Sequence, residues 1–158
     1  MNLKMSDLKK CLEGAGFTNV KTLLSSGNVA FDSSTKSDAA IERQIDTALL
    51  KDVGRSFLTI VRSVAELQAL IDSDPYQDFK IVSDAKRVVT FARKLSEPKQ
   101  RLPIEKDGAR ILIAREREAF SAYVPGPRGP VFMQLIETTF GRDVTTRTWE
   151  TVKKCAKG

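Results

Sequence analysis

The segment Leu23-Leu24-Ser25-Ser26-Gly27-Asn28-Val29-Ala30-Phe31 decides the fold of the first half of the chain. Apolar residues flank a Ser/Gly/Asn centre. This pattern indicates two short strands joined by a tight turn, because Gly and Asn tolerate the positive φ that such turns need. We therefore expect a hairpin with strands over residues 20–25 and 28–32. This sequence pattern predicts an element of the fold and does not indicate a chemical function.

A helix is expected on each side of this hairpin. Ser6 is a suitable cap for the first helix, and Gly16 is expected to end it in a Schellman-type turn. Between them, apolar residues recur at helical spacing at Leu8, Cys11, Leu12 and Ala15. The second helix is expected to bury one apolar face, formed by Ile41, Ile45, Ala48 and Leu49.

A buried strand is expected next, over residues 56–62, because this stretch is rich in strand-forming apolar residues. The order helix, strand, strand, helix, strand is the ferredoxin-like βαββαβ pattern without its first strand. Only residues 1–4 precede the first helix, too few for a strand that crosses a sheet. We therefore expect a first unit that lacks its first strand.

The second half of the sequence also mixes helices and strands. Ser63 and Glu66 form a capping box that starts a third helix. Strands are expected over residues 87–92, 110–114 and 119–124, followed by a helix that starts at Pro130 and ends at Gly141. Residues 144–147 are expected to be extended. Thr148 is expected to cap a last helix that places Trp149 in the core.

The composition is that of a globular protein, with 41% hydrophobic and 29% charged residues over 158 positions. No apolar run approaches the ~18 residues needed to span a bilayer, and no secretion signal opens the sequence. We therefore expect a cytoplasmic protein that does not enter a membrane. Cys11 and Cys155 are expected to be core thiols, with a disulfide as the less favoured alternative.

The sequence contains no histidine, which excludes Ser-His-Asp and Cys-His catalysis and His-ligated metal sites. Carboxylate, lysine, tyrosine and arginine chemistry stays open. We identify no catalytic residues, no metal ligands and no cofactor signature, so the sequence leaves open whether the protein is an enzyme.

Basic residues gather in the second half: residues 1–83 hold 10 Lys and Arg against 11 Asp and Glu, and residues 84–158 hold 16 against 9. A basic surface can contact nucleic-acid phosphates, and Phe91 or Tyr123 could stack on bases. A solvated face with surplus lysine explains the same pattern. The candidate phosphate contacts are Lys86, Arg87, Arg93, Lys94, Lys99 and Arg101.

Two short polar segments are candidates for binding an anionic small molecule. The first is the turn Ser25, Ser26, Gly27 and Asn28, whose amides can point outward, and the second is Thr145, Thr146 and Arg147, which precede a helix N-terminus. A shared site requires the two segments to converge. Otherwise both are ordinary turn and capping residues, and Arg147 pairs with a structural carboxylate.

Three segments together resemble a known bacterial family: residues 12–17 with Val20, the hairpin of residues 25–31, and residues 145–152. Members of this family carry a Ser-Gly-Asn-Val segment after the first helix, here residues 26–29, and a Thr-Thr-Arg-x-Trp-x-Thr-Val segment near the C-terminus, here residues 145–152. The sequence resembles the domain of unknown function 1697 family over essentially its whole length. The resemblance implies an α+β fold of two ferredoxin-like subdomains and implies no established reaction.

The resemblance also bears on the boundaries of the chain. Family members usually begin with a strand and an Arg-Gly-Ile-Asn-Val-Gly-Gly loop before the first helix, and here only Lys4-Met5 matches that region. We expect a truncated first subdomain over residues 1–62 and a second α+β subdomain over residues 63–158, packed as one compact unit. An unpaired sheet edge left by the missing strand would invite association.

Three functions are consistent with the sequence. The first is a non-catalytic binding or scaffold module. The second is a small-molecule enzyme or sensor for an anionic ligand, and the third is nucleic-acid binding through the basic second half. The sequence identifies neither a ligand nor the oligomeric state.

Overall fold

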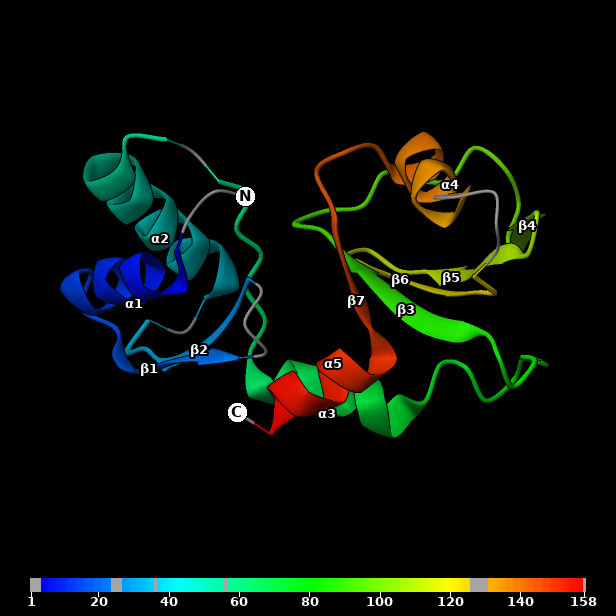
Figure 1. The fold of residues 1–158 in the computed structure, drawn as a ribbon, viewed down its shortest axis with the longest axis horizontal. Coiled ribbons are helices and arrows are strands. Elements are labelled where there is room, and N and C mark those ends of the chain that lie inside the picture. The colour runs from blue at the N-terminus through cyan, green and yellow to red at the C-terminus, as the bar shows by residue number, and fades with distance from the viewer. Residues whose placement is uncertain (1–3, 24–26, 36, 56, 126–130, 158) are drawn as a thin grey trace. The chain divides into compact units, whose positions relative to one another are not determined.

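The computed structural model describes residues 4–23, 27–35, 37–55, 57–125 and 131–157 (Figure 1). The chain forms two compact units. Unit 1 comprises Met1–Leu67 and Lys154–Gly158, and unit 2 comprises Gln68–Lys153. The described residues form helices and two antiparallel sheets, which confirms the α+β class. In the same ranges, no helix has the length and apolarity needed to cross a membrane.

Unit 1 contains the predicted hairpin between two helices. Its elements are α1 (Met5–Gly14), β1 (Thr18–Leu23), β2 (Asn28–Asp32) and α2 (Asp38–Val53). The strands pair antiparallel from Thr18 opposite Asp32 to Leu23 opposite Asn28, so the hairpin is confirmed. Leu24, Ser25 and Ser26 lie outside the described residues. Both helices and β1 bury side chains in one cluster that includes Leu12, Val20, Ile41, Ile45 and Leu49, and Val29 and Phe31 of β2 pack against it.

The ends of α1 show which local rules operate. The Phe17 N–H donates to the Leu12 carbonyl (3.2 Å) and the Gly16 N–H to the Glu13 carbonyl (3.1 Å), which is the predicted Schellman pattern. The start differs from the prediction, because Lys4 occupies the N-cap position and its side chain makes no capping hydrogen bond. Ser6 therefore lies inside the helix.

The segment after α2 differs from the predicted strand. Residues 57–62 have no strand assignment, and Leu58 is exposed. Val61 is buried at 8% exposure, and its N–H donates to the Glu42 carboxylate (N to Oε2, 2.9 Å). The Glu42 side chain thus accepts the hydrogen bond that a carbonyl of a neighbouring strand would accept in a sheet. The sheet of unit 1 has two strands among the described residues, so its ferredoxin-like arrangement stays a prediction.

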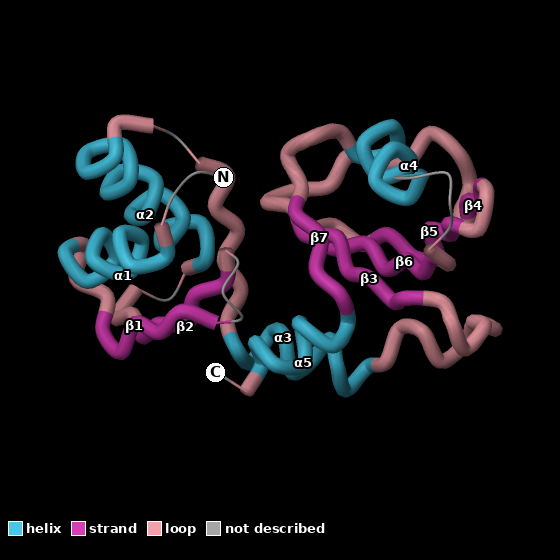
Figure 2. Tube along the Cα trace, in the orientation of Figure 1, coloured by secondary structure: helices cyan, strands magenta, loops and turns pink. Residues whose placement is uncertain are grey.

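Unit 2 is built on a five-stranded antiparallel sheet (Figure 2). Its strand order is β4 (Ile104–Lys106), β5 (Ala109–Ala114), β6 (Glu118–Tyr123), β3 (Lys86–Phe91) and β7 (Thr145–Thr148). The three longest strands match the predicted ones, and β4 was not predicted. A two-residue turn, Asp107 and Gly108, both with positive φ, joins β4 to β5.

Three helices complete the fold: α3 (Val64–Ser73), α4 (Val131–Phe140) and α5 (Trp149–Ala156). The predicted capping box of α3 is confirmed, because the Ser63 N–H donates to Glu66 Oε1 (3.0 Å) and the Glu66 N–H donates to Ser63 Oγ (3.0 Å). The boundaries between the two units fall within α3 and α5.

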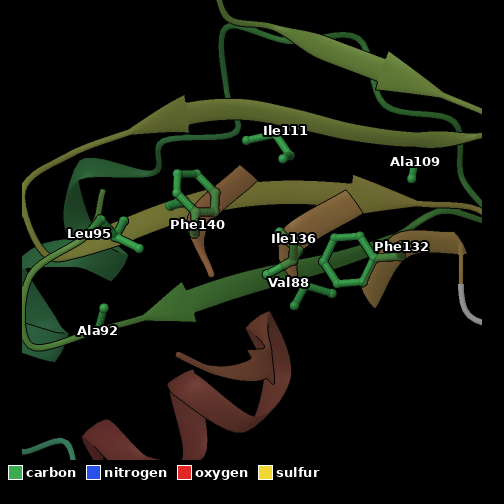
Figure 3. Close-up of a cluster of buried hydrophobic side chains, with 9 residues drawn as sticks. Val88, Ala92, Leu95, Ala109, Ile111, Phe132, Ile136 and Phe140 are labelled. Carbon is green, nitrogen blue, oxygen red and sulfur yellow. The ribbon is translucent and has the colours of Figure 1, made fainter. Parts of the chain in front are cut away.

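Each face of the unit 2 sheet carries a separate core. On one face, Phe132, Ile136 and Phe140 of α4 point towards the strands and pack against Val88 and Ile111 (Figure 3). On the opposite face, Tyr76 makes edge-to-face contacts with Phe120 and with Trp149, at ring centroid distances of 6.0 and 5.2 Å. The sheet is therefore covered on both sides, as its buried central strands require.

Candidate functional site

The polar motif of residues 145–147 lies on β7, an edge strand of the unit 2 sheet within the described residues. Thr145 lies opposite Phe91 and Arg147 lies opposite Val89, both on β3. Successive side chains of a strand alternate between its faces, so Thr145 and Arg147 share one face and Thr146 points to the other. The face of Thr146 is the one covered by α4, since its hydroxyl contacts the Met133 sulfur (3.8 Å).

Arg147 is held along its own strand. Its Nη1 donates to Thr145 Oγ1 (2.6 Å) and to the Thr146 carbonyl oxygen (2.8 Å), and the side chain is half-buried. Hydrogen bonds of this kind fix the orientation of a guanidinium, which suits it to recognise a carboxylate or phosphate. They also place a charged group on an edge strand, a common protection against unwanted pairing.

The N-terminus of α5 is already occupied by the protein's own groups. Thr148 caps the helix as predicted, because its Oγ1 accepts from the Thr151 N–H (3.3 Å). Glu150 supplies a carboxylate in the first turn, where it interacts favourably with the helix dipole. Both groups stabilise this helix end, and anion binding beside it stays a prediction.

The other predicted ligand segment belongs to unit 1. Ser25 and Ser26 lie outside the described residues, Gly27 has a φ of +70°, and Asn28 starts β2 with a half-buried side chain. Arg147 belongs to unit 2. The convergence of the two segments in one site therefore stays a prediction.

Four of the six basic candidates form two groups, one at each end of β3. Lys86 and Arg87 are its first two residues, and Arg93 and Lys94 follow its last residue, so the groups lie about 20 Å apart at the usual rise of a strand. The side chains of Lys99 and Arg101 lie further along the chain, and all six are exposed. The Arg87 guanidinium also lies 5.7 Å from the centre of the Tyr76 ring, a cation-π contact.

The second group is attached to the tip of the β5–β6 hairpin. The Ala92 N–H donates to the Arg117 carbonyl (3.0 Å) and the Leu95 N–H donates to the Glu116 carbonyl (2.8 Å). These bonds hold the backbone of Arg93 and Lys94 beside the hairpin tip. The positions of these two basic residues are thus set by the sheet.

The aromatic residues proposed for base stacking differ in their exposure. Phe91 is only 6% exposed, so its assignment as a stacking platform is wrong. The reason is its place on a central strand, where it faces the core. Tyr123 is half-buried and stacks on Phe132 with ring centroids 4.6 Å apart, and its proposed role stays a prediction.

The basic surplus is shared between the two units. Unit 2 contains 15 Lys and Arg against 12 Asp and Glu, and unit 1 contains 11 against 8. The contrast between the two halves of the sequence therefore does not follow the units of the fold. A basic surface has to be sought in local groups of residues.

Reactive side chains in the core serve the fold. Burial, together with a hydrogen bond to Asp52 and the negative charge of that residue, raises the pKa of the Cys11 thiol to about 11. Burial also raises the pKa of Tyr76 well above its ordinary value, and its hydroxyl donates to the Val88 carbonyl (2.8 Å). In the described parts of the chain, acidic and cysteine side chains form no group of three that could hold a metal ion.

Residues 1–120 match the family model described as a protein of unknown function, DUF1697. The chain belongs to the DUF1697 family. This confirms the resemblance, although the Thr145–Val152 motif lies beyond the matched residues. The family description names no function, so membership adds no reaction or ligand.

A solved structure supports the fold of this DUF1697 protein. The conserved bacterial protein SP0830 from Streptococcus pneumoniae superimposes with a TM-score of 0.67, covering 99% of this chain and 88% of that protein. The two are 16% identical, so the likeness concerns the fold alone. No curated protein matched the chain.

The sequence contained signals for some features of this DUF1697 protein that were not predicted. The dipeptide Asp107-Gly108 is a strong hairpin signal and would have identified β4. Tyr76 lies in an irregular segment between α3 and β3, yet it is 2% exposed and its hydroxyl contacts the sheet. An aromatic residue after an Asp-Pro pair gives no local sign of its tertiary role.

Proposed function

We propose that this DUF1697 protein is a non-catalytic binding or scaffold module that works in the cytoplasm. One observation supports this above all: the buried side chains that could take part in a reaction make contacts that stabilise the fold. Cys11 has a raised pKa, the Tyr76 hydroxyl binds a strand carbonyl, and the Glu42 carboxylate binds the Val61 N–H. Catalytic groups are instead tuned towards reactivity near neutral pH.

The test is a metabolite panel read in two ways on the same samples. We expect at least one ligand to raise the melting temperature, while mass spectrometry finds no conversion of any compound. Conversion by the wild type that is lost in Glu42→Gln or Cys11→Ala would overturn the proposal, because the substituted side chain would then be catalytic.

A second function, binding of a nucleic acid, is favoured by a specific group of residues in unit 2. Lys94, Lys99 and Arg101 are exposed and have no ion-pair partner among the described residues. The backbone bonds of Ala92 and Leu95 hold Lys94 beside the hairpin tip, and Lys99 and Arg101 follow it within seven residues of the chain. Unpaired cations on a held segment can contact successive phosphates of a single strand.

This second function is tested by charge removal. The variant Lys94→Gln/Lys99→Gln/Arg101→Gln is compared with Lys9→Gln/Lys10→Gln/Lys51→Gln, which removes three exposed charges from unit 1. With a labelled single-stranded RNA, we expect only the first variant to weaken binding and to reduce the salt slope by about 2. Equal losses in both variants would show that only net charge matters.

A further inference from the structure

Two hydroxyl groups are buried in the sheet of unit 2 without a hydrogen-bond partner among the described residues. They are Thr90 Oγ1 on β3 and Ser121 Oγ on β6, and both residues are 0% exposed. The described remainder of this sheet face is dominated by apolar side chains. Most buried polar side chains have a partner, so two orphan hydroxyls on adjacent strands need a physical explanation.

The strand register shows that the two hydroxyls lie near each other. Thr90 lies opposite Ala119, and Ser121 lies opposite Val88. Val88 and Ala119 both belong to the cluster beneath α4, so Thr90 and Ser121 face α4 as well. The two residues are diagonal neighbours, a relation that places Cβ atoms within about 7 Å of each other.

This spacing suits one bridging atom. A hydroxyl oxygen and its partner oxygen lie about 2.8 Å apart, so one water oxygen can bond two hydroxyls that are up to about 5.5 Å apart. The neighbouring sheet residues Ala92 and Ala119 are small, and α4 comes closest to β5 rather than to β3 or β6. The part of the interface that contains both hydroxyls is therefore the part where the helix backbone stands farther from the sheet.

We propose that Thr90 and Ser121 form a binding site for a single buried water molecule between the sheet and α4. The water accepts from or donates to each hydroxyl and links β3 to β6 on their inner face. It removes the cost of burying two polar groups in an apolar layer.

The first test uses the sign of a stability change. If a water bridges the hydroxyls, Thr90→Val and Ser121→Ala each remove one of its two partners and leave the other hydroxyl buried without a well-held hydrogen bond. Each single variant should therefore lower the urea midpoint. The double variant should recover much of this loss, because no polar group is then left. Without the water, each single variant raises the midpoint and the effects add, which would overturn the proposal. Thr138→Val, on the exposed side of α4, is the matched control and should change little.

The second test counts the water directly. Oxygen-17 relaxation dispersion of the solvent reports waters held for longer than nanoseconds and does not respond to hydroxyl protons. We expect the wild type to hold one more such water than the double variant. If the double variant fails to fold, Ser121→Ala replaces it in this comparison. An equal number in both proteins would overturn the proposal.

Discussion

Tyr76 joins a loop to the sheet of unit 2 through both its ring and its hydroxyl. The ring contacts Phe120 and Trp149, and the hydroxyl donates to the Val88 carbonyl. Glu42 acts similarly in unit 1, where its buried carboxylate accepts the Val61 N–H. In both units a single polar side chain thus holds an irregular segment against a core that the regular elements have formed.

Trp149 provides the sharpest test at the scale of one residue. It is 5% exposed and packs edge-to-face on Tyr76. We expect Trp149→Ala to lower the free energy of unfolding by about 3–5 kcal/mol, because it leaves a large cavity. Trp149→Phe should cost much less, since it keeps an aromatic ring in place. Urea denaturation followed by far-UV circular dichroism measures both, and an unchanged midpoint in Trp149→Ala would contradict a core role.

At the scale of the elements, sequence and structure agree wherever a local signal fixes the backbone. The Schellman turn at Gly16, the capping box of Ser63 and Glu66, and the cap at Thr148 were all predicted and are all present. Each depends on residues within one or two turns of the chain, so the sequence is sufficient.

Elements and sites that depend on distant partners were predicted less well. Residues 57–62 have the composition of a strand, but a strand also needs a neighbour to bind, and the Val61 amide binds Glu42 instead. The stacking role of Phe91 failed for a related reason, because burial depends on the whole sheet. Arg147 was identified from its motif, yet its bonds to Thr145 and Thr146 could not be read from the sequence.

The end of α1 offers a matched pair of glycine substitutions. Gly14 is helical, and Gly16 has a φ of +101°; a Cβ added at either position would meet no atom within 4 Å. We expect Gly14→Ala to stabilise the protein by about 0.5–1 kcal/mol through helix propensity. Gly16→Ala should destabilise it by about 1–2 kcal/mol, since it forces an L-residue into the left-handed region.

Urea midpoints of the two variants measure the difference between these glycines. Because neither added methyl group meets a neighbour, the contrast isolates the backbone conformation. If both variants shifted the midpoint in the same direction, the Schellman turn would not be a determinant of stability.

At the scale of the whole molecule, the stability of both units depends on pH through their ionisable side chains. The sequence contains no histidine, so stability should change little between about pH 6 and 7.5. Above pH 9 the free energy of unfolding should fall. The pKa of Cys11 is raised from 9.0 to about 11 in the fold, so the folded protein keeps a proton that the unfolded chain releases.

The alkaline loss is measured as the urea midpoint at pH 7, 9 and 10.5. We expect Cys11→Ala to show a smaller fall between pH 9 and 10.5 than the wild type, with Cys155→Ala as the thiol control. Tyr76, whose pKa is also raised by burial, should leave a residual decline above its ordinary pKa in all three proteins. Identical profiles for the wild type and Cys11→Ala would show that the Cys11 environment is not the source.

Unit 1 is discontinuous in sequence, since Lys154–Gly158 join Met1–Leu67 after the whole of unit 2. A ribosome therefore synthesises the last part of unit 1 only after all the strands of unit 2. A cut at either boundary also leaves the two units joined by the other, so a protease must cleave twice to separate them.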